Sequence, residues 1–224
     1  MTQVKFPIVG IYGGTFDPIH YGHLRIAEEL LDIVDFGQFY FVPSGEPRLR
    51  NIPFASKCDR KTMVHLATQD NARFSVDERE INRAGETTTV ASLREYRREF
   101  GEDVVLCFIV GIDTFLKLHQ WHCWQELFKL CHFIIVGRPG NSHIMNNEAL
   151  PQDLKNECMS RWVTHANELT RQSWGLVFAA KTSLLEISAT QIRSLIASGR
   201  SARYLLPEIV YDYIRTNHLY IGEG

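Results

Sequence analysis

Apolar runs alternate with amphipathic stretches along most of the chain. Continuous apolar or β-branched runs, typical of buried strands, lie at 8–12, 39–42, 74–76, 104–110, 133–136, 177–179 and 184–187. Apolar residues spaced three and four apart, as on one helix face, occur at 21–34, 59–67, 90–100, 151–169, from 188 onward and at 205–214. This alternation predicts an α/β fold with a doubly wound, mostly parallel sheet, helices on both faces and helices at the C-terminal end.

Local signals mark where several of these elements begin and end. Pro43 stops the second apolar run, and a loop with further prolines follows over 44–56. Gly101 ends the helix predicted over 90–100, and a second polar loop is expected over 137–147. The segment 188–191, Ser-Ala-Thr-Gln, has the form of a capping box at a helix start. No internal repeat or linker is visible, so we expect one domain over 1–224.

Composition narrows the class of protein. At 224 residues the chain is long enough for one sizeable core, and 45% hydrophobic with 22% charged residues is ordinary for a globular protein. The net charge of −2 provides no electrostatic footprint for nucleic acid. No apolar run has the length of a membrane span, and the first residues lack the basic region of a signal peptide.

The cysteines indicate a reducing compartment. The five are scattered, odd in number and without a C-x-x-C pair. A cytoplasmic location is therefore expected, with small molecules as partners, no nucleic acid and no membrane. The oligomeric state is left open by the sequence.

The most informative segment is GGTFDPIHYGH at residues 13–23. It leaves the first apolar run, and we expect a tight turn on Gly13-Gly14 and a helix start near 21–23. Backbone N–H groups and the positive end of a helix dipole would then meet at one point, which is a natural seat for phosphate. His20 and His23 are delivered to that point, and Gly22 keeps the backbone open to a bulky anion.

Two other kinds of site fit the sequence poorly. Residues 10–15, GIYGGT, are not the G-x-G-x-x-G of a dinucleotide cofactor site, and no Walker-type P-loop occurs. An oxidoreductase of that class is therefore not expected. The cluster of His and Cys at 119–123 with Cys131-His132 fits no standard zinc spacing. The acidic run 77–80 would ordinarily be a solvated face.

The 13–23 segment resembles the H-x-G-H signature of the nucleotidyltransferase superfamily, and its Thr-Phe-Asp-Pro form resembles the bacterial nicotinate mononucleotide adenylyltransferases. The second superfamily signature is similar to 187–193, Ile-Ser-Ala-Thr-Gln-Ile-Arg. Further matches occur in order at 59–63, 77–80, 111–113 with Trp121, 137–140, and 205–207 with Val210 and Tyr213. The resemblance covers nearly the whole chain and implies a Rossmann-like form of the predicted sheet.

The resemblance implies transfer of the adenylyl group of ATP to nicotinate mononucleotide, giving nicotinate adenine dinucleotide and pyrophosphate in NAD biosynthesis. It implies Mg²⁺ with the ATP and no metal-ligating residue of the chain. The implied catalytic residues are His20, His23 and Arg193. Those implied for ATP and its phosphates are Gly13, Gly14, Thr15, Phe16, Gly22, Gly111, Asp113, Ile187, Ser188 and Thr190. Those implied for the mononucleotide are Asp17, Arg50, Thr88, Thr89, Trp121 and Arg138.

Two departures from the family pattern concern the acceptor side. Where the family has Pro-Pro-His followed by Lys or Arg, residues 46–50 read Glu-Pro-Arg-Leu-Arg, so Leu49 replaces the histidine. Thr88 stands where the family has an aromatic residue. Alternatives are therefore an enzyme preferring nicotinamide mononucleotide, or a nucleotide sensor without catalysis on the same fold. The mid-chain matches argue against phosphopantetheine or a riboflavin phosphate as acceptor.

Overall fold

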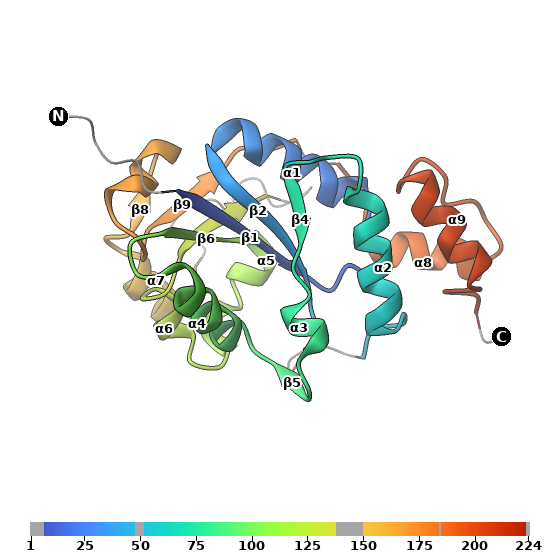
Figure 1. Cartoon of the computed structure of the whole chain (residues 1–224), viewed down its shortest axis with the longest axis horizontal. Helices are drawn as coiled ribbons and strands as arrows, with labels where there is room; N and C mark the ends of the chain where they lie inside the picture. The colour runs from blue at the N-terminus through green and yellow to red at the C-terminus, as the bar shows by residue number, and fades with distance from the viewer. Residues whose placement is uncertain (1–6, 48–51, 138–149, 184, 223–224) are drawn as a thin grey trace.

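A seven-stranded sheet forms the centre of the computed structural model, which describes residues 7–47, 52–137, 150–183 and 185–222. The strand order is β4-β2-β1-β6-β7-β9-β8, and all the strand pairings in this sheet are parallel (Figure 1). The strands are β1 Ile8–Gly14, β2 Phe36–Pro43, β4 Phe74–Val76, β6 Val105–Gly111, β7 His132–Val136, β8 Trp162–Val163 and β9 Val177–Ala180. From β1, the following strands β2 and β4 are added toward one edge of the sheet. From β6, the strands β7, β9 and β8 are added toward the other edge, which confirms the doubly wound α/β prediction.

Helices cover both faces of the sheet. They are α1 Tyr21–Ile33, α2 Lys57–Thr68, α3 Arg79–Asn82, α4 Thr89–Phe100, α5 Ile112–Phe115, α6 Trp124–Leu127, α7 Gln152–Cys158, α8 Ala189–Ala197 and α9 Glu208–Thr216. Two short 3₁₀ turns lie at Leu118–Gln120 and Ala166–Arg171. None of the helices in the described ranges is long and apolar enough to cross a membrane.

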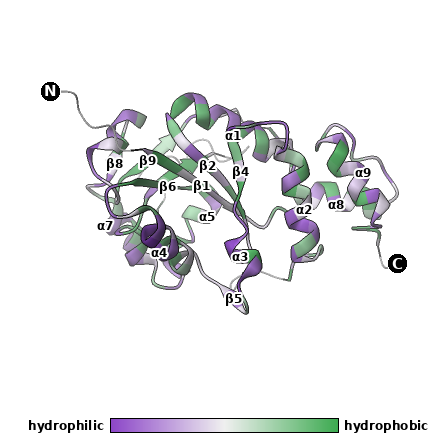
Figure 2. Ribbon diagram, in the orientation of Figure 1, coloured by the Kyte–Doolittle hydropathy of each residue, from purple (hydrophilic) through white to green (hydrophobic). Residues whose placement is uncertain are grey.

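Each face of the sheet has its own core. Successive strand residues point to opposite faces, so Cys107 joins the core under α1, α2, α8 and α9, while Leu106 joins the core under α4 to α7. Figure 2 shows hydrophobic residues along the central strands and hydrophilic residues on the outer surface of helices such as α4. Buried on both faces, the strands form the continuous apolar runs seen in the sequence.

A small parallel pair of strands stands apart from the main sheet. β3 (Glu46–Pro47) pairs with β5 (Glu86–Thr87), with Pro47 opposite Thr87. The pair joins the loop after β2 to the start of α4. Apolar periodicity could not indicate it, because each strand has only two residues.

The helix predicted over 151–169 is wrong beyond Cys158, where α7 ends. β8 follows and adds to the sheet beside β9, with Trp162 opposite Val177. The Glu168 carboxylate then accepts hydrogen bonds from the backbone N–H groups of Thr164 and His165. A side chain that satisfies backbone donors in this way starts a new turn and competes with a continuous helix.

The strand predicted over 184–187 is also wrong for its described residues, 185–187, which belong to no strand. The Ile187 N–H instead bonds back to the Leu185 carbonyl at 2.8 Å, which makes a tight turn just before α8. Leu185 and Ile187 line a pocket, and Ile187 also packs against the core under α1 and α8. The loop predicted over 137–147 lies, apart from Gly137, outside the described residues.

Candidate active site

A pocket of about 1050 Å³ opens at the carboxyl ends of β1 and β6. The strand order reverses between β1 and β6. Ligands of open parallel sheets bind at such a switch point. Its walls also come from the start of α1, the start of α4 and the segment that enters α8. The volume is at the upper end of the range for small-molecule sites.

The turn that begins the pocket lies later than predicted. Gly13 and Gly14 belong to β1 and pair with Val42 and Pro43 of β2, so the expected turn on the two glycines is wrong. The chain turns over 15–19 instead, where Phe16 has a φ of 48° and the Asp17-Pro18 bond is cis. A Cβ at Gly14 would lie 2.8 Å from the Phe16 ring. Glycine is needed there because the buried Phe16 ring packs against the strand.

His20 and His23 form a stacked pair at the first turn of α1. Their ring centroids are 3.8 Å apart with 28° between the planes, and the His20 backbone N–H donates to His23 Nδ1 at 3.3 Å. A Cβ at Gly22 would meet the His20 ring at 3.0 Å, so this glycine makes room for the imidazole. His23 packs edge-on against Phe16 at 5.1 Å. The two imidazoles are thus held against one wall of the pocket.

The second signature, residues 187–193, contacts the first, residues 13–23. Ser188 caps α8, its hydroxyl accepting a bond from the Gln191 N–H at 3.1 Å, which confirms the predicted helix start. One turn along, Arg193 donates to the Asp17 carbonyl at 2.6 Å across 176 positions of sequence, and to the Thr190 hydroxyl at 3.3 Å. A guanidinium and the N-terminus of a nine-residue helix therefore face the pocket together with the histidines.

Asp17 has a bracing role that sequence reasoning did not foresee. The residue lines the pocket and is buried. Its carboxylate accepts bonds from the backbone N–H groups of Phe54 and Ala55, at 2.8 and 3.1 Å, and from the Tyr220 hydroxyl. The Phe54 ring in turn lies under the Arg193 guanidinium, 4.5 Å from its centre. Asp17 thus fixes the backbone of one segment of the pocket lining.

Trp121 lines the pocket and Trp124 does not. The Trp121 ring lies edge-on to Phe108, with centroids 6.2 Å apart, and Phe108, Thr88 and Thr89 also line the pocket. Trp124 instead packs edge-on against Phe128, with ring centroids 6.3 Å apart. Between the two tryptophans, Cys123 has a φ of 51°.

Nearly all residues implied by the resemblance meet at this pocket, although they come from distant parts of the chain. Those that line it are Gly13, Gly14, Thr15, Phe16, Asp17, His20, Gly22, His23, Thr88, Thr89, Gly111, Asp113, Trp121, Ile187, Ser188, Thr190 and Arg193. Arg50 and Arg138 lie outside the described residues, as does Leu49.

Two charged residues of the site escaped the sequence analysis. Arg60, 1% exposed, donates to the carbonyls of Thr15 and Gly45, both at 2.9 Å, and burial lowers the pKa of its guanidinium. Glu80 lines the pocket, and its carboxylate accepts a bond from Ser92 at 2.7 Å. Both lie in segments that match the family, and that match was the only available signal.

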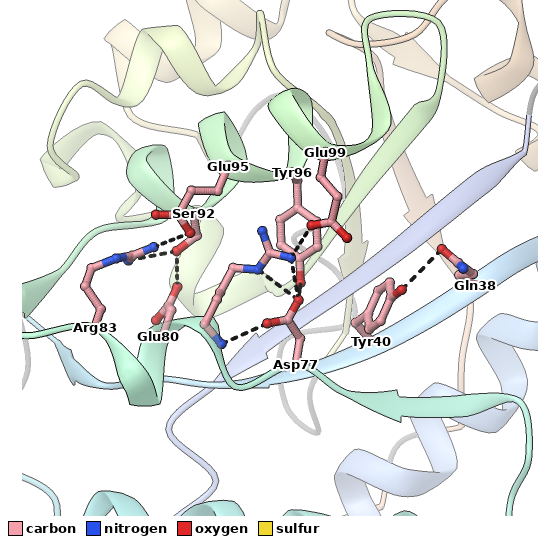
Figure 3. A network of polar contacts seen from close by, with 10 residues as sticks. Gln38, Tyr40, Asp77, Glu80, Arg83, Ser92, Glu95, Tyr96 and Glu99 are labelled. Carbon is pink, nitrogen blue, oxygen red and sulfur yellow. Dashed lines mark hydrogen bonds and ion pairs between the residues drawn. The ribbon is translucent and has the colours of Figure 1, made fainter.

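The acidic run at 77–80 is not a solvated face. Asp77 accepts bonds from Arg79 Nε at 2.8 Å and from the Tyr96 hydroxyl at 2.7 Å, which joins α3 to α4 (Figure 3). Burial opposes ionisation of Asp77, but these donors together hold its pKa below the usual value. The expectation of a solvated face is wrong because the run folds back against the amphipathic helix that follows it.

Comparison with known proteins agrees with this geometry. The cytidylyltransferase-like family model matches residues 11–195. A Dechloromonas aromatica protein named "Probable nicotinate-nucleotide adenylyltransferase" is 41% identical over 212 residues, covering 95% of this chain and 97% of the relative. A Methylococcus capsulatus protein of the same name is 38% identical over 214 residues, covering 95% of this chain and 99% of the relative.

The fold is also that of a solved structure. The nicotinic acid mononucleotide adenylyltransferase of Plasmodium falciparum, complexed with NaAD, matches with a TM-score of 0.71. The identity is 15%, and the match covers 96% of this chain and 97% of the other. Because the family model and the relatives both span most of its length, the chain belongs to the cytidylyltransferase-like family and, within it, to the nicotinate-nucleotide adenylyltransferases.

Proposed function

We propose that His20, His23 and Arg193 carry out the adenylyl transfer that this chain catalyses in NAD biosynthesis. The reaction moves the adenylyl group of ATP onto nicotinate mononucleotide and gives nicotinate adenine dinucleotide and pyrophosphate. The observation that carries the assignment is the meeting of the two histidines and Arg193 at one pocket, from opposite ends of the chain.

The chemistry requires positioning more than proton transfer. A phosphate oxygen of the mononucleotide attacks the α-phosphorus of ATP, and the bond from that phosphorus to the bridging oxygen breaks in line. The nucleophile is already an anion, so no strong general base is needed. Two anions must instead be held together while charge develops on the leaving pyrophosphate.

The two signatures divide this work. The imidazole N–H groups of His20 and His23, beside the positive end of α1, would donate to the α- and β-phosphate oxygens. Ser188, Thr190 and Arg193, at the start of α8, would hold the departing pyrophosphate. The bond from Arg193 to the Asp17 carbonyl keeps the two groups in register.

We infer Mg²⁺ as the divalent ion that enters with ATP. Mg²⁺ keeps several waters and needs few protein ligands when phosphates are present. When bound with ATP, the ion would supply positive charge to the phosphates, and the residues of the chain would orient the two substrates.

The acceptor is assigned to the wall that holds Trp121, Thr88 and Thr89. The Trp121 ring presents a flat aromatic surface on which a pyridine ring would stack. Asp17 would act there by fixing the backbone of Phe54 and Ala55. Arg50 and Arg138 remain proposed ligands of the mononucleotide on the family match alone.

The remaining assignments concern the whole chain. We propose that residues 1–224 act as one nucleotidyltransferase domain in the cytoplasm, with ATP and the mononucleotide as its small-molecule partners. All five cysteines are free, and three of them are buried. Free thiols suit a reducing compartment.

The decisive experiment is pyrophosphate release from ATP and Mg²⁺ with nicotinate mononucleotide and nicotinamide mononucleotide as parallel acceptors. We expect strong turnover with the acid form and none when the acceptor is omitted. Faster turnover with nicotinamide mononucleotide would instead support the alternative acceptor. Leu49 and Thr88, which depart from the family pattern, leave that alternative open. ATP binding without turnover on either acceptor would instead support a sensor.

A further inference from the structure

We propose that Glu80 is a positioning residue for the acceptor, because it ties together the three segments that build the acceptor wall. This inference rests on the proposed function in one respect, which is that nicotinate mononucleotide is the ligand of that wall. Glu80 lines the pocket but acts through the groups that it holds.

Three partners surround the Glu80 carboxyl. The Ser92 hydroxyl of α4 donates to Oε1 at 2.7 Å. The Gly45 backbone and the Thr87 side chain, whose hydroxyl donates to the Glu46 carbonyl at 3.4 Å, also lie at this carboxyl and oppose the rise of its pKa that burial causes. Gly45 follows β2, Thr87 ends β5 and Ser92 lies in the first turn of α4. One side chain therefore joins three segments that are separate in sequence.

These segments place the backbone that faces the ligand. β3 and β5 pair beside Glu80, and Thr88 and Thr89 follow β5 directly into the pocket wall. A Cβ at Gly45 would overlap the backbone oxygen of Glu80, so only glycine allows the approach. A shift of the Glu80 carboxyl would therefore be passed to Thr88 and Thr89 through Thr87.

The orientation of the carboxyl is itself determined. Arg83 Nη1 donates to the Ser92 oxygen at 3.2 Å, so the Ser92 hydrogen is directed toward Glu80 (Figure 3). Arg83 is fixed in turn by Glu95 at 2.7 Å. Burial raises the pKa of Glu80, although Ser92 and the Arg83 charge oppose the shift. A glutamine at position 80 has the same size, but its NH2 group only donates. It would therefore face at least one of these donors without accepting a hydrogen bond.

The other half of the network in Figure 3 provides a matched control. Glu99, also on α4, accepts a bond from Arg79 at 2.8 Å, and its side chain is 52% exposed. It is not part of the pocket wall. Glu99→Gln thus makes the same chemical change, in the same network, on the side that faces away from the ligand.

The test compares Glu80→Gln, Glu99→Gln and wild type in steady-state kinetics, with mononucleotide binding also measured by calorimetry. We expect Glu80→Gln to raise the KM and Kd for nicotinate mononucleotide about tenfold, as for loss of hydrogen bonds to a carboxylate. The KM for ATP and kcat at saturating acceptor should stay within about twofold. Ser92→Ala should act in the same direction with a smaller effect, which provides a second variant if Glu80→Gln folds poorly.

The outcomes separate this inference from the proposed function. If wild type binds the mononucleotide without turnover, adenylyl transfer to it fails, but the binding comparison still tests Glu80. Unchanged acceptor binding in both Glu80→Gln and Ser92→Ala would overturn the positioning role. Equal rises in the KM for ATP and for the acceptor would also overturn it, because a general loosening of the fold would explain them. Wild type that does not bind the mononucleotide would overturn both.

Discussion

The Tyr220 hydroxyl donates a hydrogen bond of 2.7 Å to the Asp17 carboxylate, although the two residues are 203 positions apart. Burial and the Asp17 charge raise the pKa of Tyr220, so the phenol stays protonated and remains a donor. The segment after α9 thus braces the turn that carries His20. It does so through the same carboxylate that fixes the backbone of Phe54 and Ala55.

Replacing Tyr220 by Phe removes this donor and keeps the ring. We expect the free energy of unfolding to fall by about 1.5–3 kcal/mol, the usual contribution of a hydrogen bond to a charged group. Urea unfolding curves measure the change, and Tyr204→Phe is the control because Tyr204 is 86% exposed. Equal losses in the two variants would mean that the bond to Asp17 contributes no specific stability.

Removal of either imidazole of the stacked pair should slow the reaction. For His20→Ala and for His23→Ala we expect kcat to fall about 10²–10³-fold, as for loss of one transition-state hydrogen-bond donor. Initial rates of pyrophosphate release provide the measurement, and circular dichroism checks the fold. Turnover near that of wild type in a folded variant would remove that histidine from the catalytic residues.

The two tryptophans should differ in their effect on acceptor binding. Trp121→Ala is expected to raise the acceptor KM several-fold, since stacking on an aromatic ring contributes about 0.5–1.5 kcal/mol beyond burial. Trp124→Phe keeps the packing against Phe128 and should leave the acceptor KM unchanged. Kinetics at saturating ATP test both variants. A larger effect at Trp124 would reverse the assignment made from the pocket wall.

His132 should make stability depend on pH. Its side chain is fully buried, Leu176 N–H donates to its Nδ1 at 2.8 Å, and its Nε2 lies 2.9 Å from the Gln172 carbonyl. This geometry selects the neutral ring with the proton on Nε2, and burial lowers its pKa to about 4.

In the unfolded chain this histidine has a pKa near 6.5, whereas in the folded chain the pKa is about 4. Between these two pH values the unfolded chain binds more protons, so the free energy of unfolding falls as the pH falls. From pH 7 to pH 5 the loss due to His132 is about 2 kcal/mol. Unfolding midpoints at the two pH values should show this loss in wild type and in His165→Gln, an exposed control. His132→Gln should show a smaller pH dependence whatever its absolute stability, and an unchanged one would contradict the assignment.

The order of strands and helices was largely predictable from sequence. Strands buried on both faces must be apolar throughout, and helices on the sheet must be apolar on one face, so β1, β6, α1 and α4 are visible as patterns. The end motifs also indicated the pocket, because Gly-Gly-Thr, Phe-Asp-Pro and His-x-Gly-His occur together between a strand and a helix. These features depend on local constraints that each segment satisfies alone.

Other features depend on which segments meet. The apolar stretch at 184–187 was read as a strand, and its described residues line the pocket, because periodicity does not distinguish a sheet from a cavity wall. Asp77 and Glu80 are only partly exposed, and α4 supplies Tyr96 and Ser92 as their hydrogen-bond partners. The choice of Trp121 over Trp124 likewise required the packing around Phe128.

The chain by itself thus determined its α/β order and the residue types of the pocket, because strand burial and helix capping depend on residues that are close in sequence. Tertiary structure alone decided that Tyr220 reaches Asp17 and that Glu80 joins Gly45, Thr87 and Ser92. A buried polar group needs a hydrogen-bond partner, but any segment can supply it. Only the folded chain shows which one does.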